Sequence, residues 1–300
     1  MSRKAWAGPD VLLGRRALIT GASQGLGREI ARAVLAASGD VAICARTAPD
    51  IAATAAELAQ EFPQRCIVSM RCDLAKTGDL ERFYVASIET LGGLDVVINN
   101  AGVHGPIGKL DDIDWGSWTE AIAINLVGTA YSCRLAVEHF KSQPRQSGAK
   151  IINLSGGGAT LPQTGLSAYG ASKAGLVRLT ETLAEEVRAN GIDVNAVAPG
   201  ALATRLTREV HQAGPERVGS EYHARVSDLL AKDGMSLACA AELCVYLASR
   251  ESDGLTGRLI SAPWDPWPFT NRARREITDS DIYTLRRIVP KDRGKDWGDC

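Results

Sequence analysis

The sequence carries no overall charge and has no long apolar run. Its 34 Lys and Arg residues nearly balance 35 Asp and Glu residues, which leaves a formal net charge of −1. A chain without a basic or acidic excess does not attract nucleic acid or an anionic membrane surface over its whole length. No apolar run approaches the roughly 18 residues of a membrane span, and residues 1–16 are too polar for a signal peptide. These absences predict a cytoplasmic protein that binds neither nucleic acid nor membrane.

Histidine and cysteine are too few and too scattered to indicate a metal centre or a disulfide framework. The four histidines show no ligand spacing, so we expect no metal site. The seven cysteines are an odd number and include no Cys-x-x-Cys pair. Cys44, Cys66, Cys72 and Cys133 stand in or beside apolar runs, which predicts buried, reduced thiols.

Short apolar runs alternate with stretches of helical spacing along the chain. The apolar runs cover residues 16–20, 41–44, 66–71, 94–98, 151–154, 192–198 and 258–262. Helices are expected after Gly27, over 52–61, over 115–141, from 169 to 190 and over 240–249. This alternation predicts βαβ units and an α/β fold with a mostly parallel sheet.

The first apolar run leads directly into a glycine-rich turn and a helix. The turn reads Gly21-Ala22-Ser23-Gln24-Gly25-Leu26-Gly27. Gly21 allows the tight turn, while Gly25 and Gly27 let a pyrophosphate and the neighbouring strand approach the backbone closely. The helix N-terminus would offer free N–H groups to the phosphates. Strand, turn and helix in this order therefore predict a dinucleotide site.

The end of the second apolar run indicates which dinucleotide is bound. A dinucleotide fold often has an acidic residue here for the adenosine ribose, but this chain has Ala45 followed by Arg46. Without that carboxylate, and with a guanidinium adjacent, a 2′-phosphate can be accommodated. We therefore expect NADP to be preferred, with NAD as the alternative.

Residues 150–175 carry the chemistry that we expect of the protein. An apolar strand and a glycine-rich loop precede a helix that holds Tyr169 and Lys173 in its first turns. Residues at i and i+4 share one helix face, so the ammonium should lie beside the phenol and lower its pKa. Tyr169 could then give a proton to a carbonyl oxygen or take one from an alcohol.

Two segments flank a single catalytic domain, which we place at residues 15–262 and which includes a lid. Residues 1–14 form an N-terminal extension, of which 1–13 look loose, and the polar residues 201–235 are expected to form a substrate lid. Residues 263–300 form a C-terminal arm rich in Trp and Arg. The arm could cover a sheet edge or a partner subunit. Alternatively, its Trp and Arg residues could grip an anionic or sugar-like substrate.

Taken together, these motifs resemble the short-chain dehydrogenase/reductase family over about residues 15–262. The motifs are TGASQGLG at 20–27, Asp73, NNAG at 99–102, Asn125, the Tyr169-x-x-x-Lys173 pair and PGALAT at 199–204. The resemblance implies a Rossmann-type, doubly wound parallel sheet of about seven strands in a three-layer αβα arrangement. It also implies hydride transfer between a nicotinamide and a carbonyl or alcohol carbon, and a homodimer or homotetramer.

The resemblance also assigns roles to individual residues. Tyr169 is the acid/base, Lys173 lowers its pKa and holds the nicotinamide ribose, and Asn125 organises a water that relays protons to Lys173. Asp73 would touch the adenine, Asn99 the adenosine side and Thr204 the carboxamide. The expected cofactor contacts are Gly21, Ser23, Gln24, Gly25, Leu26, Gly27, Arg46, Asp73, Leu74, Asn99, Ala101, Gly102, Tyr169, Lys173, Pro199, Gly200 and Thr204.

One expected catalytic residue is missing. The family places a serine thirteen positions before the tyrosine, where this chain has Gly156. Ser155, Thr160, a backbone N–H of the glycine run or a hydroxyl of the substrate could replace the lost donor. Three consecutive glycines also suggest room for a bulky or polyhydroxylated substrate. We therefore expect Gly156→Ser to lower activity, mainly through KM.

The sequence leaves three functions open. The first is an NAD(P)-dependent oxidoreductase acting on a polar, possibly sugar-like or anionic, small molecule. The second is an isomerase or dehydratase of the same fold with a tightly bound cofactor, which the missing serine favours. The third is a nucleotide-sensing binding protein, against which the presence of Tyr169, Lys173 and Asn125 argues.

Overall fold

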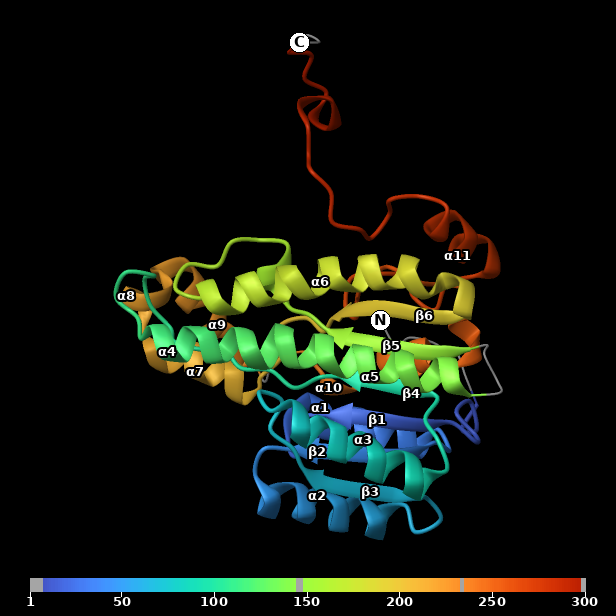
Figure 1. The fold of residues 1–300 in the computed structure, drawn as a ribbon. Coiled ribbons are helices and arrows are strands. Elements are labelled where there is room, and N and C mark those ends of the chain that lie inside the picture. The colour runs from blue at the N-terminus through green and yellow to red at the C-terminus, as the bar shows by residue number, and fades with distance from the viewer. Residues whose placement is uncertain (1–7, 144–147, 233–234, 298–300) are drawn as a thin grey trace.

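The computed structural model describes residues 8–143, 148–232 and 235–297. Seven parallel strands form one sheet in the order β3-β2-β1-β4-β5-β6-β7 (Figure 1). The strands are β1 (Arg16–Thr20), β2 (Asp40–Ala45), β3 (Ile67–Arg71), β4 (Val96–Asn99), β5 (Ala149–Leu154), β6 (Ile192–Ala198) and β7 (Leu259–Ser261). The strand order changes direction between β1 and β4, which confirms the doubly wound sheet predicted from the sequence.

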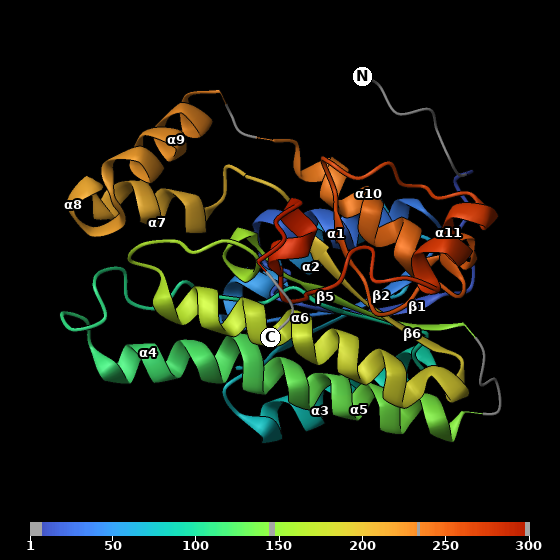
Figure 2. The same cartoon turned by 90° about the horizontal axis from the view of Figure 1, so that it is seen from above.

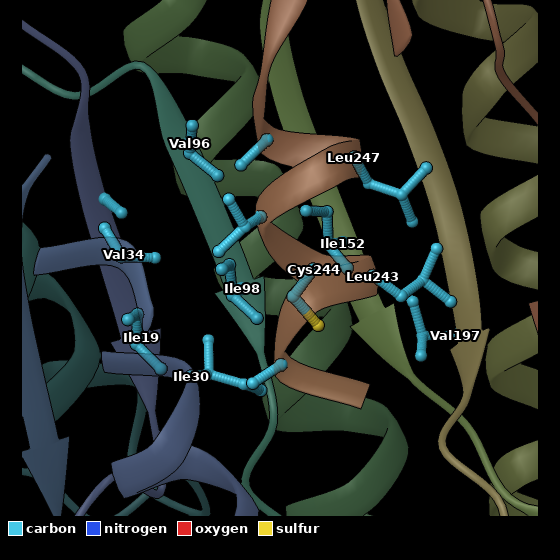
Figure 3. Packing of buried hydrophobic residues seen from close by; sticks show 14 of the residues in the cluster. Ile19, Ile30, Val34, Val96, Ile98, Ile152, Val197, Leu243, Cys244 and Leu247 are labelled. Atoms are coloured by element: carbon cyan, nitrogen blue, oxygen red, sulfur yellow. The ribbon is translucent and has the colours of Figure 1, made fainter. Parts of the chain in front are cut away.

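Helices cover both faces of the sheet (Figure 2). One face carries α1 (Gly25–Ala36), α2 (Ala48–Glu61) and α10 (Leu237–Ala248), and the other carries α3 (Thr77–Leu91), α5 (Thr129–Ser142) and α6 (Ser167–Val187). Successive strand residues point to opposite faces, so Leu18 packs in one core cluster and Ile19 in the other. Figure 3 shows the cluster of Ile19, with Ile98 and Ile152 of the sheet beneath α10. The three-layer αβα arrangement is therefore confirmed.

The helix expected over 115–141 is interrupted by a π-helical segment. It consists of α4 (Trp115–Ile122), the π-helical η1 (Ala123–Gly128) and α5. Asn125 lies within η1 and is fully buried. Single π-helical turns are frequent at functional sites, because the extra residue turns a side chain out of the regular helical stripe.

Three short helices follow β6, where the sequence predicts a lid. They are α7 (Arg205–Ala213), α8 (Pro215–Val218) and α9 (Ser220–Ala231), and α7 and α9 pack together around Val210 and Val226. Leu202 and Met235 form an isolated parallel β-bridge, and α10 begins soon after Met235. Residues 233–234 of the expected lid lie outside the described residues.

Both terminal segments are fastened to the body. Leu12 is buried and its N–H donates to Ala37 O, so residues 8–14 are not loose, while residues 1–7 lie outside the described part. In the C-terminal arm, Trp267, Phe269 and Ile277 of α11 (Asn271–Thr278) pack into the core. The arm also covers the sheet edge, because Leu259 N of β7 donates to Tyr283 O. Leu285 N still donates to Glu181 Oε1 of α6, and the end of the described chain beyond it extends away from the body (Figure 1).

The cysteines follow the expectation with one exception. Cys44, Cys72 and Cys133 are buried and free, as predicted. Cys66 is exposed, and the prediction of burial was wrong there because β3 begins one residue later, at Ile67.

Candidate active site

A cavity of about 1060 Å³ lies at the carboxyl ends of the strands. Its walls come from the turns after β1, β2, β3 and β4, from the loop after β5, from the start of α6 and from the lid helices α7 and α9. Open parallel sheets bind ligands at this edge, beside the point where the strand order reverses. The cavity is therefore the place to look for each residue predicted from the sequence.

The glycine-rich turn lines the cavity and has no space for a side chain at Gly21 or Gly27. Gly21 has φ +68°, and a Cβ on it would lie 2.7 Å from Ala101 Cα. A Cβ on Gly27 would lie 2.2 Å from Gly21 O, so α1 starts in direct contact with the turn. Gln24 precedes α1 in an extended conformation, and its side chain makes no hydrogen bond to the first turn of that helix. The N–H groups of this turn thus fit a phosphate group.

Arg46 and Asp73 line the neighbouring end of the cavity, beyond β2 and β3. Asp73 N donates to Asp79 Oδ2 at 3.0 Å, and this bond is the main cause of the lowered pKa of Asp79. The Asp79 carboxylate also pairs with Arg71 and Arg82. Asp79 therefore fixes the loop that presents Asp73, a role that the sequence did not indicate.

Asn99, which the resemblance places on the adenosine side, is not among the residues that line the cavity. Its side chain is buried and donates to Asn153 Oδ1 at 2.9 Å. Asn100 lines the cavity instead, and its Nδ2 donates to Thr20 O and Gly21 O. This shift arises because β4 continues through Asn99, whose side chain then points into the packed face of the sheet.

Asn125 lies behind the cavity wall and holds the loop after β4. Its Oδ1 accepts from Val103 N at 2.9 Å, and its Nδ2 donates to Val103 O at 2.7 Å and Ser172 Oγ at 3.0 Å. A Cβ on Gly102 would lie 3.3 Å from Asn125 Oδ1 and 3.4 Å from Lys173 Nζ. Asn125 thus ties the π-helical segment, the loop and α6 together beside Lys173.

Tyr169 and Lys173 lie side by side on α6, as their spacing predicts. Lys173 Nζ is 5.8 Å from the centroid of the Tyr169 ring and donates to Leu154 O at 2.7 Å. Burial lowers the pKa of Lys173 to about 8 and raises the pKa of Tyr169 to about 12. The pKa of Tyr169 in the free protein is therefore raised and not lowered as expected, mainly because burial disfavours the phenolate.

We expect the buried ammonium of Lys173 to destabilise the cofactor-free protein below about pH 8. The unfolded chain keeps this proton up to about pH 10.5, whereas the folded state loses it near pH 8. The unfolded state then binds more protons between those values, so the unfolding free energy should rise with pH there. Lys173→Met removes this dependence. The difference in unfolding free energy, wild type minus Lys173→Met, should rise by about 2 kcal/mol from pH 7 to pH 10 in urea titrations. A flat difference would show that Lys173 keeps an ordinary pKa.

The position of the missing serine is filled by the hydroxyl of Tyr169. A Cβ on Gly156 would lie 2.2 Å from Tyr169 Oη and 3.0 Å from Tyr169 Cζ. Gly156 has an extended backbone, with φ −175° and ψ 171°, which any residue can adopt. The glycine is thus required here by the tyrosine side chain and not by its own backbone.

His104 is a cavity residue that the sequence analysis missed. It is buried and contacts the ring of Tyr169 edge-on, with ring centroids 4.9 Å apart. Its Nδ1 lies 3.5 Å from Glu209 Oε2 of α7, and this contact is the main cause of the lowered pKa of Glu209. The only signal in the sequence was its place two residues after the NNAG motif.

Several buried polar atoms on the cavity wall have no hydrogen-bond partner within the described residues. They are Ser155 Oγ, Gln163 Oε1 and Ser261 Oγ, while His104 Nδ1 has only the Glu209 carboxylate, at 3.5 Å. Buried polar atoms are seldom left unpaired in folded proteins, so their grouping around one cavity indicates a polar ligand.

Most of the predicted contacts line this one cavity. They are Gly21, Ser23, Gln24, Gly25, Leu26, Gly27, Arg46, Asp73, Leu74, Ala101, Gly102, Ser155, Gly156, Thr160, Tyr169, Lys173, Pro199, Gly200 and Thr204. Trp264 of the C-terminal arm also lines it, whereas Trp267 packs in the core. The structure contains no group of three or more potential metal ligands among its described residues. In the same residues, no helix is both long and apolar enough to cross a membrane.

The chain is similar to known proteins over most of its length. The short chain dehydrogenase family matches residues 15–214. The chain is 31% identical to 3beta-hydroxysteroid dehydrogenase 1 of Eggerthella lenta, over 84% of this chain and 93% of the relative. It is 30% identical to L-fucose dehydrogenase of Oryctolagus cuniculus, over 80% of each. A solved dehydrogenase/reductase from Sinorhizobium meliloti is similar with a TM-score of 0.72 and 27% identity, over 84% of this chain and 95% of that one. The chain therefore belongs to the short chain dehydrogenase family.

Proposed function

We propose that the protein is an NADP-preferring oxidoreductase that interconverts a carbonyl and a secondary alcohol on a polar small molecule. The observation that carries this proposal is the meeting of Tyr169 and Lys173 with the glycine-rich turn around one cavity. The turn and the N-terminus of α1 fit a pyrophosphate, and Arg46 lies where an adenosine 2′-phosphate would be read.

Tyr169, Lys173 and Asn125 would then have different roles in the reaction. A bound nicotinamide supplies or accepts the hydride. Tyr169 Oη gives a proton to the substrate oxygen during reduction, and takes one from it during oxidation. Lys173, held by Leu154 O, lies beside the phenol and stabilises its anion once the proton has left. Asn125 keeps the loop at Val103 in place, and its family role in a water relay to Lys173 stays part of this proposal.

The remaining wall of the cavity favours a polar substrate. Gln163, Tyr222, Arg225 and Trp264 line it away from the glycine-rich turn. Arg225 lies over the Tyr222 ring at 5.7 Å, and Gln163 Nε2 donates to Tyr222 Oη at 3.4 Å. Amide, guanidinium and indole groups together suit a sugar-like or anionic compound.

Turnover with candidate substrates tests the proposal. Purified protein, NADPH or NADP and a panel of sugars, polyols, hydroxy acids and their ketones should show a change in nicotinamide absorbance. Reaction of a substrate without such a change would instead support the second candidate, an isomerase or dehydratase with a tightly bound cofactor, which Gly156 favours. Binding of the nucleotide with no reaction at all would support a sensor.

We expect Arg46→Ala to weaken NADPH binding by about 1.5–3 kcal/mol, roughly tenfold to a hundredfold, and to leave NADH binding nearly unchanged. The guanidinium would make a charge-assisted contact with the 2′-phosphate, which NADH lacks. Asp50 also lines the cavity, and Asp50→Asn is the matched variant. It removes a negative charge that would repel the phosphate, so it should tighten NADPH binding. Fluorescence titration with both cofactors provides the measurement. Equal losses for NADPH and NADH would show that Arg46 does not read the phosphate.

We also propose that the protein is a homodimer or homotetramer in the cytoplasm. Trp115 and Val127 are exposed on the helix that contains Asn125, which is consistent with a symmetric contact there. Light scattering at micromolar concentration would test the assembly. The free, buried thiols of Cys44, Cys72 and Cys133 suit a reducing compartment.

A further inference from the structure

The site needs a hydrogen-bond donor for the substrate oxygen that residue 156 does not supply. The hydroxyl of Tyr169 fills the space beside Gly156, so a side chain there would collide with the proposed acid/base. A second donor is still required, because an oxyanion donor is typically worth roughly 10²–10³ in rate.

Ser155 and Thr160 are less well placed to donate a hydrogen bond to the substrate oxygen. Ser155 continues the pairing of β5, with its N–H on Val197 O, and Gly156 beside it is extended. Side chains of successive extended residues point in opposite directions, so Ser155 Oγ is directed away from the side on which Tyr169 Oη lies. Thr160 is exposed at the cavity rim.

His104 is the buried polar side chain of this wall that contacts Tyr169 itself. The two rings meet edge-on at 80°, and only 6% of His104 is exposed. Its nearest charged neighbour on the lid is Glu209, whose other oxygen pairs with Arg205. With Nδ1 of His104 toward the carboxylate, the second ring nitrogen, Nε2, remains for a ligand in the cavity.

We propose that His104 donates the hydrogen bond to the substrate oxygen that the serine donates elsewhere in the family, and that Glu209 orients its ring. This inference rests on the proposed function, because it assumes a substrate oxygen beside Tyr169. In this arrangement His104 only donates a hydrogen bond, and Tyr169 exchanges the proton with the substrate. Glu209 is a positioning residue, and because it stands on α7, the lid must be in place for the donor to be aligned.

Two measurements on the full-length enzyme test the proposal. The first is the reduction of isatin, an activated ketone, by NADPH. The second is binding of isobutyramide, an unreactive amide carbonyl, to the enzyme–NADPH complex, followed by cofactor fluorescence. The variants are His104→Phe, which keeps the contact with the Tyr169 ring, His104→Gln, which keeps an N–H donor, Glu209→Gln, and Ser155→Ala for comparison.

We expect His104→Phe to lower kcat on isatin by roughly 10²-fold with little change in KM. Its affinity for isobutyramide should fall by about tenfold, while NADPH affinity stays within a few-fold. His104→Gln should recover part of both losses. Glu209→Gln should lose about tenfold in kcat, the range for a residue that orients a functional group.

Several results would overturn the proposal. They are an unchanged kcat and isobutyramide affinity in His104→Phe, a rise in KM alone, a larger loss in Ser155→Ala, and failure of the wild type to bind isobutyramide. Weakened NADPH binding in both His104 variants would show general damage and would also overturn it. If the wild type does not reduce isatin, the proposed ketone reduction fails for this probe, and isobutyramide affinity alone still decides the role of His104.

Discussion

Replacing Tyr169 with Phe should lower kcat by roughly 10²–10⁴-fold, the range for loss of a general acid/base. The substitution removes only Oη, which lies beside Gly156 on the cavity wall. The aromatic ring remains to pack against His104 and to lie near Lys173 Nζ. Steady-state kinetics on any substrate found in the turnover panel would measure the loss.

NADPH binding provides the control for this variant. Because the ring and Lys173 stay in place, the dissociation constant for NADPH should remain within a few-fold of the wild-type value. Tyr222→Phe removes a second hydroxyl from the same cavity and should cost much less, because Tyr222 lies on the lid. Retention of more than about a tenth of the wild-type kcat in Tyr169→Phe would show that another group exchanges the proton.

The fold could be predicted from the sequence because its signals are local. Each apolar run that became a strand is followed by a turn or helix signal, and βαβ units allow few arrangements of such elements. The glycine-rich turn could also be predicted. The atoms that would clash with a Cβ at Gly21 or Gly27 belong to the turn itself and to one adjacent loop. Boundaries differed by one to four residues, as at both ends of β4 and the start of α2, because hydrogen bonding and not apolarity sets them.

The features that the sequence did not reveal depend on contacts between distant segments. The sequence marked the buried Asn125 as unusual, but not its partner Val103, whose N–H and carbonyl both bond the Asn125 side chain from a loop 22 residues earlier. The contact between His104 and Glu209 joins residues 105 positions apart through the lid. The pKa values of Tyr169 and Lys173 depend on burial, which the spacing of two residues on a helix does not report.

We expect both Gly156→Ala and Gly156→Ser to lower kcat by at least about tenfold, a fraction of the 10²–10⁴ that general acid–base catalysis is worth. The sequence alone favoured an effect mainly on KM, through space for the substrate. The structure instead predicts a loss in kcat, because the added Cβ would lie 2.2 Å from Tyr169 Oη and displace that hydroxyl. The extended backbone of residue 156 accepts any side chain, so neither variant should lose more than a little thermal stability.

The pair of variants separates crowding from the missing hydroxyl. Alanine and serine share the Cβ and differ only in Oγ, so equal losses in kcat would assign the effect to displacement of Tyr169. The affinity for NADPH should stay within a few-fold, because the glycine-rich turn and Arg46 lie at the other end of the cavity. A kcat for Gly156→Ser above the wild-type value would contradict this account. It would mean that Tyr169 can move aside at little cost, and that the enzyme lacks a donor which His104 does not replace.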